Sequence, residues 1–412
     1  MYDKLTQSHM PSDTRQNNGV DQSQNGIDVG SRRAFLGLGS AAALGSLAGC
    51  LGDDDNGNGN GNGNGGATDD SGAGDDEPEK PDQITVRAWG GVWEGSLEES
   101  IAEPFTEETG IDVQFDNTDR TVMQGDIRTA IQQDREPPVN VMWTVEPAAH
   151  EEYRMDLAEP LDESIVTNID EMFNHAIPDV DDSIPYLTLY SYTYALSYNE
   201  DALEDITGSS EPPESWNDIK SDEFENAFGQ YDNAYGFWPV FSELSDTPLD
   251  SDDLSAVYDE IEEFEPTIGH IGDDTSLTEQ IREGEIACAP LIMNNLLDAY
   301  EDGEPVGWTL PEEGATLRGD SMYTPQNQSE SELYWSQVFI NFAAAAEHQS
   351  EWTESLGLPM TNSNTEPMDY MIDDPSYPTD EEDFETLLTV DLDVYAEESP
   401  EWFEEFNIIM GA

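Results

Sequence analysis

The sequence predicts an α/β fold in which mainly parallel strands alternate with helices. Three observations support this prediction. Short runs of β-branched and aromatic residues alternate with segments whose apolar residues recur at helical spacing. Glycines follow several of the helical segments, as expected where a helix ends and a strand begins. At 412 residues, the chain is too long for one ordinary domain and suits two lobes with additional segments.

The first strand–helix–strand unit begins with Ile84–Trp89, which has the pattern of a buried strand. Ser96 with Glu99 three residues later predicts a capping box at the start of a helix. Gly110 predicts the left-handed end of that helix, and the next strand starts at Ile111. The expected apolar face of the helix is Leu97, Ile101 and Phe105.

The same alternation returns further along the chain. Helical faces are predicted at Met123, Ile127 and Ile131, and again at Leu277 and Ile281 before Gly284. Strands are predicted at Val139–Trp143, at Glu285–Leu291 and up to about Leu310, the last after a helix that ends at Gly303. In α/β folds of this kind, ligands bind near the carboxyl ends of the strands.

Residues 186–198 alternate as a strand does and are rich in tyrosine. The pattern puts on one face Tyr186, Tyr190, Tyr192, Tyr194 and Tyr198. It puts on the other face Leu187, Leu189 and Ala195. Two interpretations stay open, which are ordinary aromatic packing and one wall of a binding cleft.

The charge balance is strongly acidic, with 13 Lys and Arg against 92 Asp and Glu and a net charge of -79. Such a chain is either disordered or adapted to molar salt, where the Debye length falls to roughly 3 Å. The 9 Trp, 16 Tyr and 14 Phe favour a folded protein of a hypersaline environment. Nucleic-acid binding is excluded because no basic stripe is present to neutralise phosphates.

The N-terminal segment resembles an export signal. Residues 31–36 read Ser-Arg-Arg-Ala-Phe-Leu, a twin-arginine pattern, and a short Gly- and Ala-rich apolar stretch follows. The stretch is too short and too weakly hydrophobic to span a membrane. Leu47–Cys50 resembles a lipobox. We therefore expect residues 1–49 to be a signal removed during twin-arginine export, and Cys50 to carry a lipid on the outer face of the cell membrane.

Residues 50–83 contain acidic runs and Asn-Gly repeats and predict a flexible linker with a reach of roughly 30 Å. The chain has two cysteines, so no disulfide framework is expected once Cys50 carries the lipid. Cys288 is expected to be a small buried hydrophobic residue.

Several short blocks in the second part of the chain occur in a set order. They are Trp89–Trp93, Pro104–Ile111, Pro213–Asp218, Pro311–Ala315 followed by Asp320 and Ser321, Ile340–Phe342 and Gly357–Asn362. In order and spacing they resemble extracellular solute-binding proteins of the spermidine/putrescine type. The resemblance extends from about Ile84 to the C-terminus.

The resemblance implies a two-lobed fold of the periplasmic binding protein type (type II), with a ligand cleft between the lobes. The chain would cross between lobes near Tyr192 and near Arg318–Gly319. Lobe one would be 84–191 with 319–364, and lobe two 192–318 with 365–412. Such receptors are not enzymes, carry no cofactor or metal, and close by hinge motion to deliver a solute to a membrane ABC permease. A monomer is expected.

The resemblance also suggests where the solute binds. Asp320 stands where the family has a carboxylate that pairs a ligand amine, and Tyr192 lies at the first crossing. Arg318 and Met293 stand in place of aromatic residues, as does Leu358. Asn233 and Gly236, with Asp232 adjacent, stand where an acidic pair occurs.

These replacements leave a polyamine and an anionic solute both open. Arg318 would favour a carboxylate or phosphate by bidentate bonding, or would be neutralised by Asp320 and shape the pocket. Trp93 would stack on the ligand from the first loop, and Glu146 would lie in the loop after the third strand. For both, ordinary packing or solvation is the alternative. The candidate site is Trp93, Glu146, Tyr192, Asp232, Asn233, Met293, Arg318 and Asp320.

Sequence motifs of catalytic sites are absent. The five histidines are scattered without metal-ligand spacing, and the sequence contains no Gly-x-Ser-x-Gly elbow or Walker loop. An exported hydrolase and a structural surface protein remain as alternatives. Asn327 begins a glycosylation sequon.

Overall fold

The computed structural model describes residues 77–384 and 386–411. The predicted signal, the predicted lipid anchor at Cys50 and most of the predicted linker lie outside the described residues. The strands are β1 (Gln83–Arg87), β2 (Asp112–Asp116), β3 (Val141–Val145), β4 (Ala158–Glu159), β5 (Leu187–Asn199), β6 (Phe228–Tyr231), β7 (Ile268–Gly272), β8 (Cys288–Ile292), β9 (Val306–Thr309) and β10 (Leu317–Pro325).

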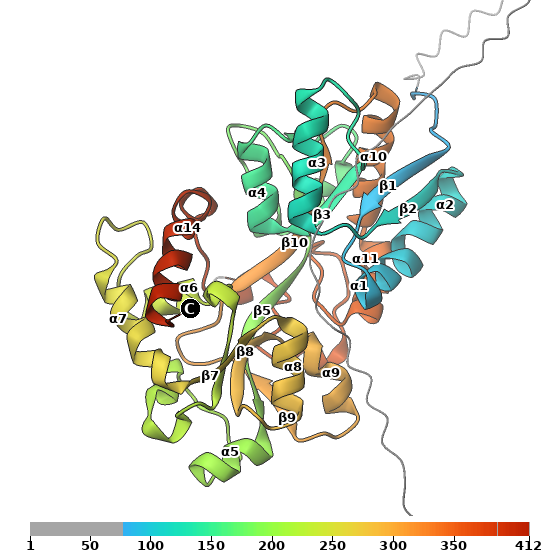
Figure 1. Cartoon of the computed structure of the whole chain (residues 1–412). Coiled ribbons are helices and arrows are strands. Elements are labelled where there is room, and N and C mark those ends of the chain that lie inside the picture. Colours follow the sequence, from blue (N-terminus) through green and yellow to red (C-terminus); the bar gives the residue numbers. More distant parts are fainter. Residues whose placement is uncertain (1–76, 385, 412) are drawn as a thin grey trace, which may run out of the picture. The chain divides into compact units, whose positions relative to one another are not determined.

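The strands form one mixed sheet in the order β2-β1-β3-β10-β5-β8-β6-β7, with β4 paired to β10 and β9 to β5 (Figure 1). Parallel pairs stand at both ends, where β1 joins β2 and β3, and β6 joins β7 and β8. In the middle, β10 and β5 run antiparallel to their neighbours and to each other. The parallel groups agree with the predicted fold class, and the antiparallel centre connects them.

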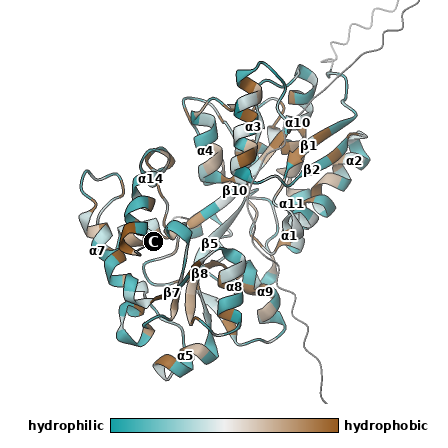
Figure 2. Ribbon diagram, in the orientation of Figure 1, coloured by the Kyte–Doolittle hydropathy of each residue, from teal (hydrophilic) through white to brown (hydrophobic). Residues whose placement is uncertain are grey.

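Helices cover both sides of the sheet. The α-helices are α1 (Gly91–Leu97), α2 (Glu103–Thr109), α3 (Arg120–Gln132), α4 (Glu146–Arg154), α5 (Glu200–Thr207), α6 (Trp238–Leu244), α7 (Ser255–Phe264), α8 (Asp274–Arg282), α9 (Asn294–Glu301), α10 (Glu330–Ala343), α11 (Ala346–Leu356), α12 (Asp369–Ile372), α13 (Glu381–Phe384) and α14 (Leu392–Ile409). A π-helical turn (Glu98–Ala102) joins α1 to α2, and short 3-10 turns occur at Thr167–Glu171, Asn174–Ala176, Trp216–Lys220, Asp222–Phe224, Asp232–Ala234 and Glu265–Thr267. Figure 2 shows both hydrophilic and hydrophobic colours along the helices, as expected of helices with one buried face.

The first helix begins earlier than predicted, so the predicted capping box is wrong. Gly90 (φ 82°) and Gly91 (φ 58°) adopt left-handed conformations that turn the chain directly from β1 into α1. Ser96 therefore lies inside the helix, where its hydroxyl donates to the carbonyl oxygen of Trp93 at 2.9 Å. The predicted left-handed end at Gly110 (φ 78°) is confirmed at the end of α2.

The tyrosine-rich strand is β5, which begins at Leu187, one residue after Tyr186. Its pairing with β10 shifts register, so that Asp320 lies opposite Tyr190 and Ser321 opposite Thr188. Such a bulge changes which residues share a face. Tyr186 packs in a different hydrophobic cluster from Tyr190, and the shared face of the tyrosines stays a prediction.

Two of the sequence blocks contact each other far from the sheet centre. The side chain of Ser215 caps the turn that starts at Trp216 and donates to the carboxylate of Glu313. Trp216 is fully buried, and its indole nitrogen donates to the carbonyl oxygen of Gly314 at 2.8 Å. Its ring packs edge-on against Phe237, with 4.8 Å between ring centres. This cluster fixes residues 213–218 against 311–315.

Three further predictions concern single residues or segments. Cys288 is buried in β8 and unpaired, as predicted. The amide nitrogen of Asn327 donates to the carbonyl oxygen of Arg135 at 2.6 Å, and its use as a glycosylation site stays a prediction. Within residues 77–384 and 386–411, no helix combines the length and apolar character that a membrane crossing requires.

Candidate ligand-binding cavity

A cavity of about 590 Å³ lies where the carboxyl ends of strands from both parallel groups meet. The lining follows β1 and β3 on one side and β6, β7 and β8 on the other, and β5 and β10 pass between them. The lining residues are Trp89, Trp93, Val145, Tyr192, Tyr194, Tyr231, Asp232, Tyr235, Gly272, Asp273, Asp274, Thr275, Ile292 and Asp320. Its position at strand ends agrees with the sequence prediction, and its volume suits a small organic molecule.

Asp320, on β10, is the most buried carboxylate of this lining, with 4% of its surface exposed. Tyr190 donates to one of its oxygens at 2.6 Å and Tyr192 to the other at 3.1 Å. Burial raises the pKa of Asp320 to about 6, although these phenols and the nearby Arg87 favour the ionised form. Among the described residues, no Lys, Arg or His side chain forms a salt bridge with this buried carboxylate.

Strand pairing places the two phenols. Asp320 lies opposite Tyr190 on β5, and the register shift occurs immediately after this pair. Tyr190 is fixed by Trp143 and Trp352, whose ring centres lie 6.2 and 5.3 Å away in edge-on geometry. The carboxylate and its two donors thus belong to one rigid strand pair.

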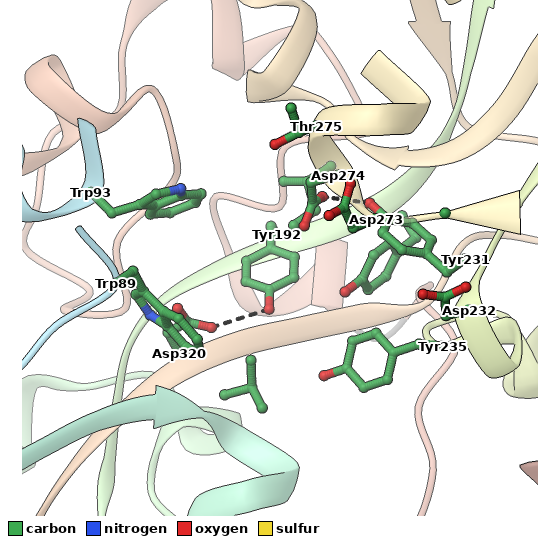
Figure 3. Close-up of a pocket in the computed structure, with 14 residues that line it drawn as sticks. Trp89, Trp93, Tyr192, Tyr231, Asp232, Tyr235, Asp273, Asp274, Thr275 and Asp320 are labelled. Atoms are coloured by element: carbon green, nitrogen blue, oxygen red, sulfur yellow. Dashed lines mark hydrogen bonds between the residues drawn. The ribbon is translucent and has the colours of Figure 1, made fainter. Parts of the chain in front are cut away.

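Trp89 and Trp93 form one wall of the cavity (Figure 3). The left-handed turn at Gly90 and Gly91 brings both indoles to the same side of the chain. The guanidinium carbon of Arg87 lies 4.0 Å from the ring centre of Trp89 and supports that ring by a cation–π contact. The sequence predicts Trp93 as a ligand contact but not Trp89, although both belong to the block Trp89–Trp93.

The opposite wall comes from the ends of β6 and β7 (Figure 3). The carboxylate of Asp274 accepts from Tyr231 at 2.5 Å and from Asn295 at 3.0 Å. Asp273 caps α8 by accepting from the backbone nitrogen of Ser276 at 2.9 Å. The phenol of Tyr235 has no hydrogen-bond partner among the described residues.

The lining is acidic and aromatic. Its aspartates are Asp232, Asp273, Asp274 and Asp320, and its aromatic rings are Trp89, Trp93, Tyr192, Tyr194, Tyr231 and Tyr235. Among the described residues, none of the side chains that line the cavity is basic. Ring faces and carboxylates both stabilise positive charge, so the cavity is suited to a cation.

Of the eight candidate residues, four line the cavity, namely Trp93, Tyr192, Asp232 and Asp320. The other four, Glu146, Asn233, Met293 and Arg318, are not among the lining residues. Met293 is fully buried before α9, and the side chain of Asn233 accepts from Asn407 at 2.8 Å. We therefore do not include these four in the cavity.

Arg318 and Glu146 lie outside the cavity lining. Arg318 is 3% exposed, donates to the carbonyl oxygen of Leu317 at 3.1 Å, and lies over the ring of Tyr395. Glu146 is the first residue of α4, so its predicted position in a loop is wrong; α4 follows β3 without an intervening loop. Burial raises the pKa of Glu146 to about 7, and the charge of Arg318 opposes this rise.

The residues that sequence reasoning missed had partial signals. Tyr194 belongs to the tyrosine-rich strand, for which the sequence favours packing and a cleft wall equally. Asp273 and Asp274 follow a strand directly and start a helix, the position at which α/β folds place ligand contacts. Among the described residues, no cluster of His, Cys, Asp and Glu has a geometry that fits a metal ion.

The family model of bacterial extracellular solute-binding proteins matches residues 100–379. No curated protein sequence is significantly similar to the chain. The spermidine/putrescine ABC transporter substrate-binding protein of Streptococcus pneumoniae is similar in structure, with a TM-score of 0.65 and 20% identity over 80% of this chain and all (100%) of that one. A GABA receptor has a TM-score of 0.65 and 18% identity over 80% and 97% of the two chains. An ABC transporter substrate-binding protein of Bradyrhizobium japonicum has a TM-score of 0.66 and 16% identity over 80% and 100%.

At these identities the structural similarities show the fold alone, which is the two-lobed α/β fold of periplasmic solute-binding proteins. This agrees with the fold that the sequence blocks implied. The residues that the family model matches make up more than half of the chain and include strands of both parallel groups. The chain therefore belongs to the family of bacterial extracellular solute-binding proteins.

Proposed function

We propose that the protein captures a small organic cation outside the cell and delivers it to a membrane ABC permease. The observation that carries this proposal is the buried carboxylate of Asp320, held by Tyr190 and Tyr192 in a cavity whose other ionisable lining groups are also acidic or phenolic. A cation that entered the cavity would supply the missing positive charge. A buried charge that gains an opposite partner contributes several kcal/mol to binding.

An anionic solute is the weaker candidate. Arg318, which favoured an anion in the sequence, is directed toward Tyr395 and does not line the cavity. An anion would instead meet the four aspartates of the lining. Like charges at close range repel strongly where water is partly excluded.

Polyamines are one class of cation that fits this proposal. The sequence blocks resemble spermidine/putrescine receptors, and a protein of that name is similar in structure. Met293 and Arg318 stand where the family has aromatic residues. The cavity has other aromatic rings in its lining, which are Trp89, Tyr194, Tyr231 and Tyr235. The aromatic lining therefore supports an amine ligand more strongly than the residues at the family's ligand-contact positions do.

The receptor role also requires export, anchoring and closure. We propose that Cys50 carries the lipid and that residues 50–83 are the linker, as the sequence predicts. We propose hinge closure about the crossing strands, where Tyr192 of β5 pairs with Arg318 of β10. The proposed lobes are 84–191 with 319–364, and 192–318 with 365–412.

The proposal is tested by calorimetric titration of the full chain with a panel that contains amines, carboxylates and phosphates. We expect saturable one-to-one binding of at least one amine and no binding of the anions. Binding of an anion alone would contradict the proposal. Chemical conversion of a bound compound would instead favour an exported hydrolase.

Capture is expected to fall as the pH drops below about 6. The cation needs ionised Asp320, whose pKa is about 6 in the free protein, so protonation removes its counter-charge. Below this pH the affinity should decrease by up to about tenfold per pH unit, and binding should release about half a proton near pH 6 and up to about one proton well below it. Calorimetry in buffers of different ionisation enthalpy measures this release.

The stability of the free protein should respond in the opposite direction. Because burial raises the pKa of Asp320 above its unfolded value near 3.8, the folded state binds more protons between about pH 4 and 6. The contribution of Asp320 to stability therefore increases as the pH falls through this window. For ligand binding, an affinity for the cation that does not change between pH 7.5 and 5 would contradict the assignment of Asp320 as its counter-charge.

A further inference from the structure

Both carboxylate oxygens of Asp320 already accept hydrogen bonds from the protein itself. A carboxylate is an acceptor only, with two oxygens that each accept from a small number of donors. One oxygen already accepts from Tyr190 and the other from Tyr192. The residue is 4% exposed, and the indole of Trp89 lies beside the carboxylate (Figure 3). Its charge therefore acts on the cavity while little of its oxygen surface is open to a ligand donor.

Among the other lining side chains at this end, the one acceptor is the phenol oxygen of Tyr192, whose proton is donated to Asp320. Trp89 and Trp93 each present ring carbon and one N–H donor, and Val145 is aliphatic. A primary ammonium has three N–H donors, which all need acceptors when it leaves water. The phenol oxygen of Tyr192 and the little that is open of Asp320 supply too few acceptors for all three.

A fully alkylated ammonium has no N–H group, and its charge is spread over the attached alkyl carbons. It gains from contact with aromatic faces and from a nearby carboxylate without forming hydrogen bonds. The pair Trp89 and Trp93 beside the buried charge of Asp320 matches these requirements.

The opposite end of the cavity differs. Asp232 and Asp273 are exposed there, and only one oxygen of Asp273 is used to cap α8. Asp274 is also exposed, with one of its oxygens accepting from Tyr231 and Asn295. Open carboxylate oxygens in contact with water suit an N–H or O–H donor of the ligand.

We propose that the captured cation carries a fully alkylated ammonium group at the Asp320 end and a hydrogen-bond donor at the end formed by Asp232 and Asp273. This inference rests on the proposed capture of an organic cation and specifies its chemical class. The two ends select different groups because one presents a buried charge with few free acceptors and the other presents open carboxylate oxygens.

The test compares two ligands of equal length, butane-1,4-diamine and (4-aminobutyl)trimethylammonium, by calorimetry with the full chain. We expect the trimethylated compound to bind at least tenfold more tightly. Equal or tighter binding of the diamine would overturn this inference and leave the capture of a cation standing. If neither compound nor any other amine binds, both proposals fail.

Tyr190→Phe tests the cause of the selectivity. Tyr190 is outside the cavity lining, and its replacement frees one oxygen of Asp320 while the ring is kept. The preference for the trimethylated ligand should decrease at least threefold. Tyr377→Phe is the matched control, because Tyr377 is a buried tyrosine whose hydroxyl has no hydrogen-bond partner among the described residues, and it is not part of the lining. An unchanged preference in Tyr190→Phe would overturn the assignment to occupied oxygens. If that variant does not fold, the comparison of the two ligands on the unaltered protein decides.

Discussion

Asp320→Asn is expected to weaken cation binding by about 30- to 5,000-fold, the largest effect of any single change in the cavity. The substitution keeps the shape of the side chain and removes its charge, so the bound cation loses its buried partner. Removal of one member of a desolvated charge pair costs about 2–5 kcal/mol. Calorimetric titration with the tightest amine ligand measures the loss.

Folding should not be the cause of this loss. The amide introduced by Asp320→Asn would remain within reach of Tyr190 and Tyr192, and the change removes a charge whose burial is unfavourable. The thermal midpoint of the variant should therefore be at least that of the unaltered protein. Glu146→Gln is the matched control, because Glu146 is another acid whose pKa is raised by burial but is not part of the lining. Asp320 would be removed from the site if both variants bound the ligand equally well.

Trp216→Ala is expected to lower the free energy of unfolding by about 3–5 kcal/mol, the usual cost of truncating a fully buried tryptophan. The change leaves a cavity beside Phe237 and removes the hydrogen bond to the carbonyl oxygen of Gly314. It also loosens the contact between residues 213–218 and 311–315. Urea denaturation at fixed salt concentration, followed by circular dichroism, measures the loss.

Trp93→Ala provides the comparison for this prediction. Trp93 is partly exposed at the cavity and makes one stacked contact with Tyr190 at 6.0 Å between ring centres. Its truncation should cost less than half as much stability but should weaken ligand binding. Equal losses of stability in the two variants would mean that the cluster around Trp216 is no more important to the fold than the cavity wall.

The fold was predictable because it depends on local patterns. Alternating apolar spacing and left-handed glycines such as Gly110 mark where elements begin and end. The position of the antiparallel centre was not predictable in this way, since β5 and β10 are joined by pairs such as Tyr190 with Asp320, 130 positions apart. The register shift between β5 and β10 depends on the same long-range pairing.

The cavity was predictable only in part, for a related reason. Asp320 was found through an ordered set of sequence blocks. Glu146 and Asp273 both follow a strand and lie at the start of a helix, yet only Asp273 lines the cavity. Which way such a side chain points depends on how its helix packs, and a single sequence does not contain that information directly. Arg318 illustrates the same limit, since its guanidinium is drawn toward Tyr395.

The place of β10 in the sheet also has a consequence for biosynthesis. β10 lies between β3 and β5 in space, but it starts at Leu317, long after β3 ends at Val145 in the chain. At roughly 5–20 residues per second, a ribosome needs on the order of ten to thirty seconds to cover that interval. Until then β3 and β5 lack the neighbour that separates them, and Asp320 has not been made. The nascent chain therefore cannot complete its binding cavity before most of it has been translated. A translocation machinery that accepts the finished, folded protein would act only after that point.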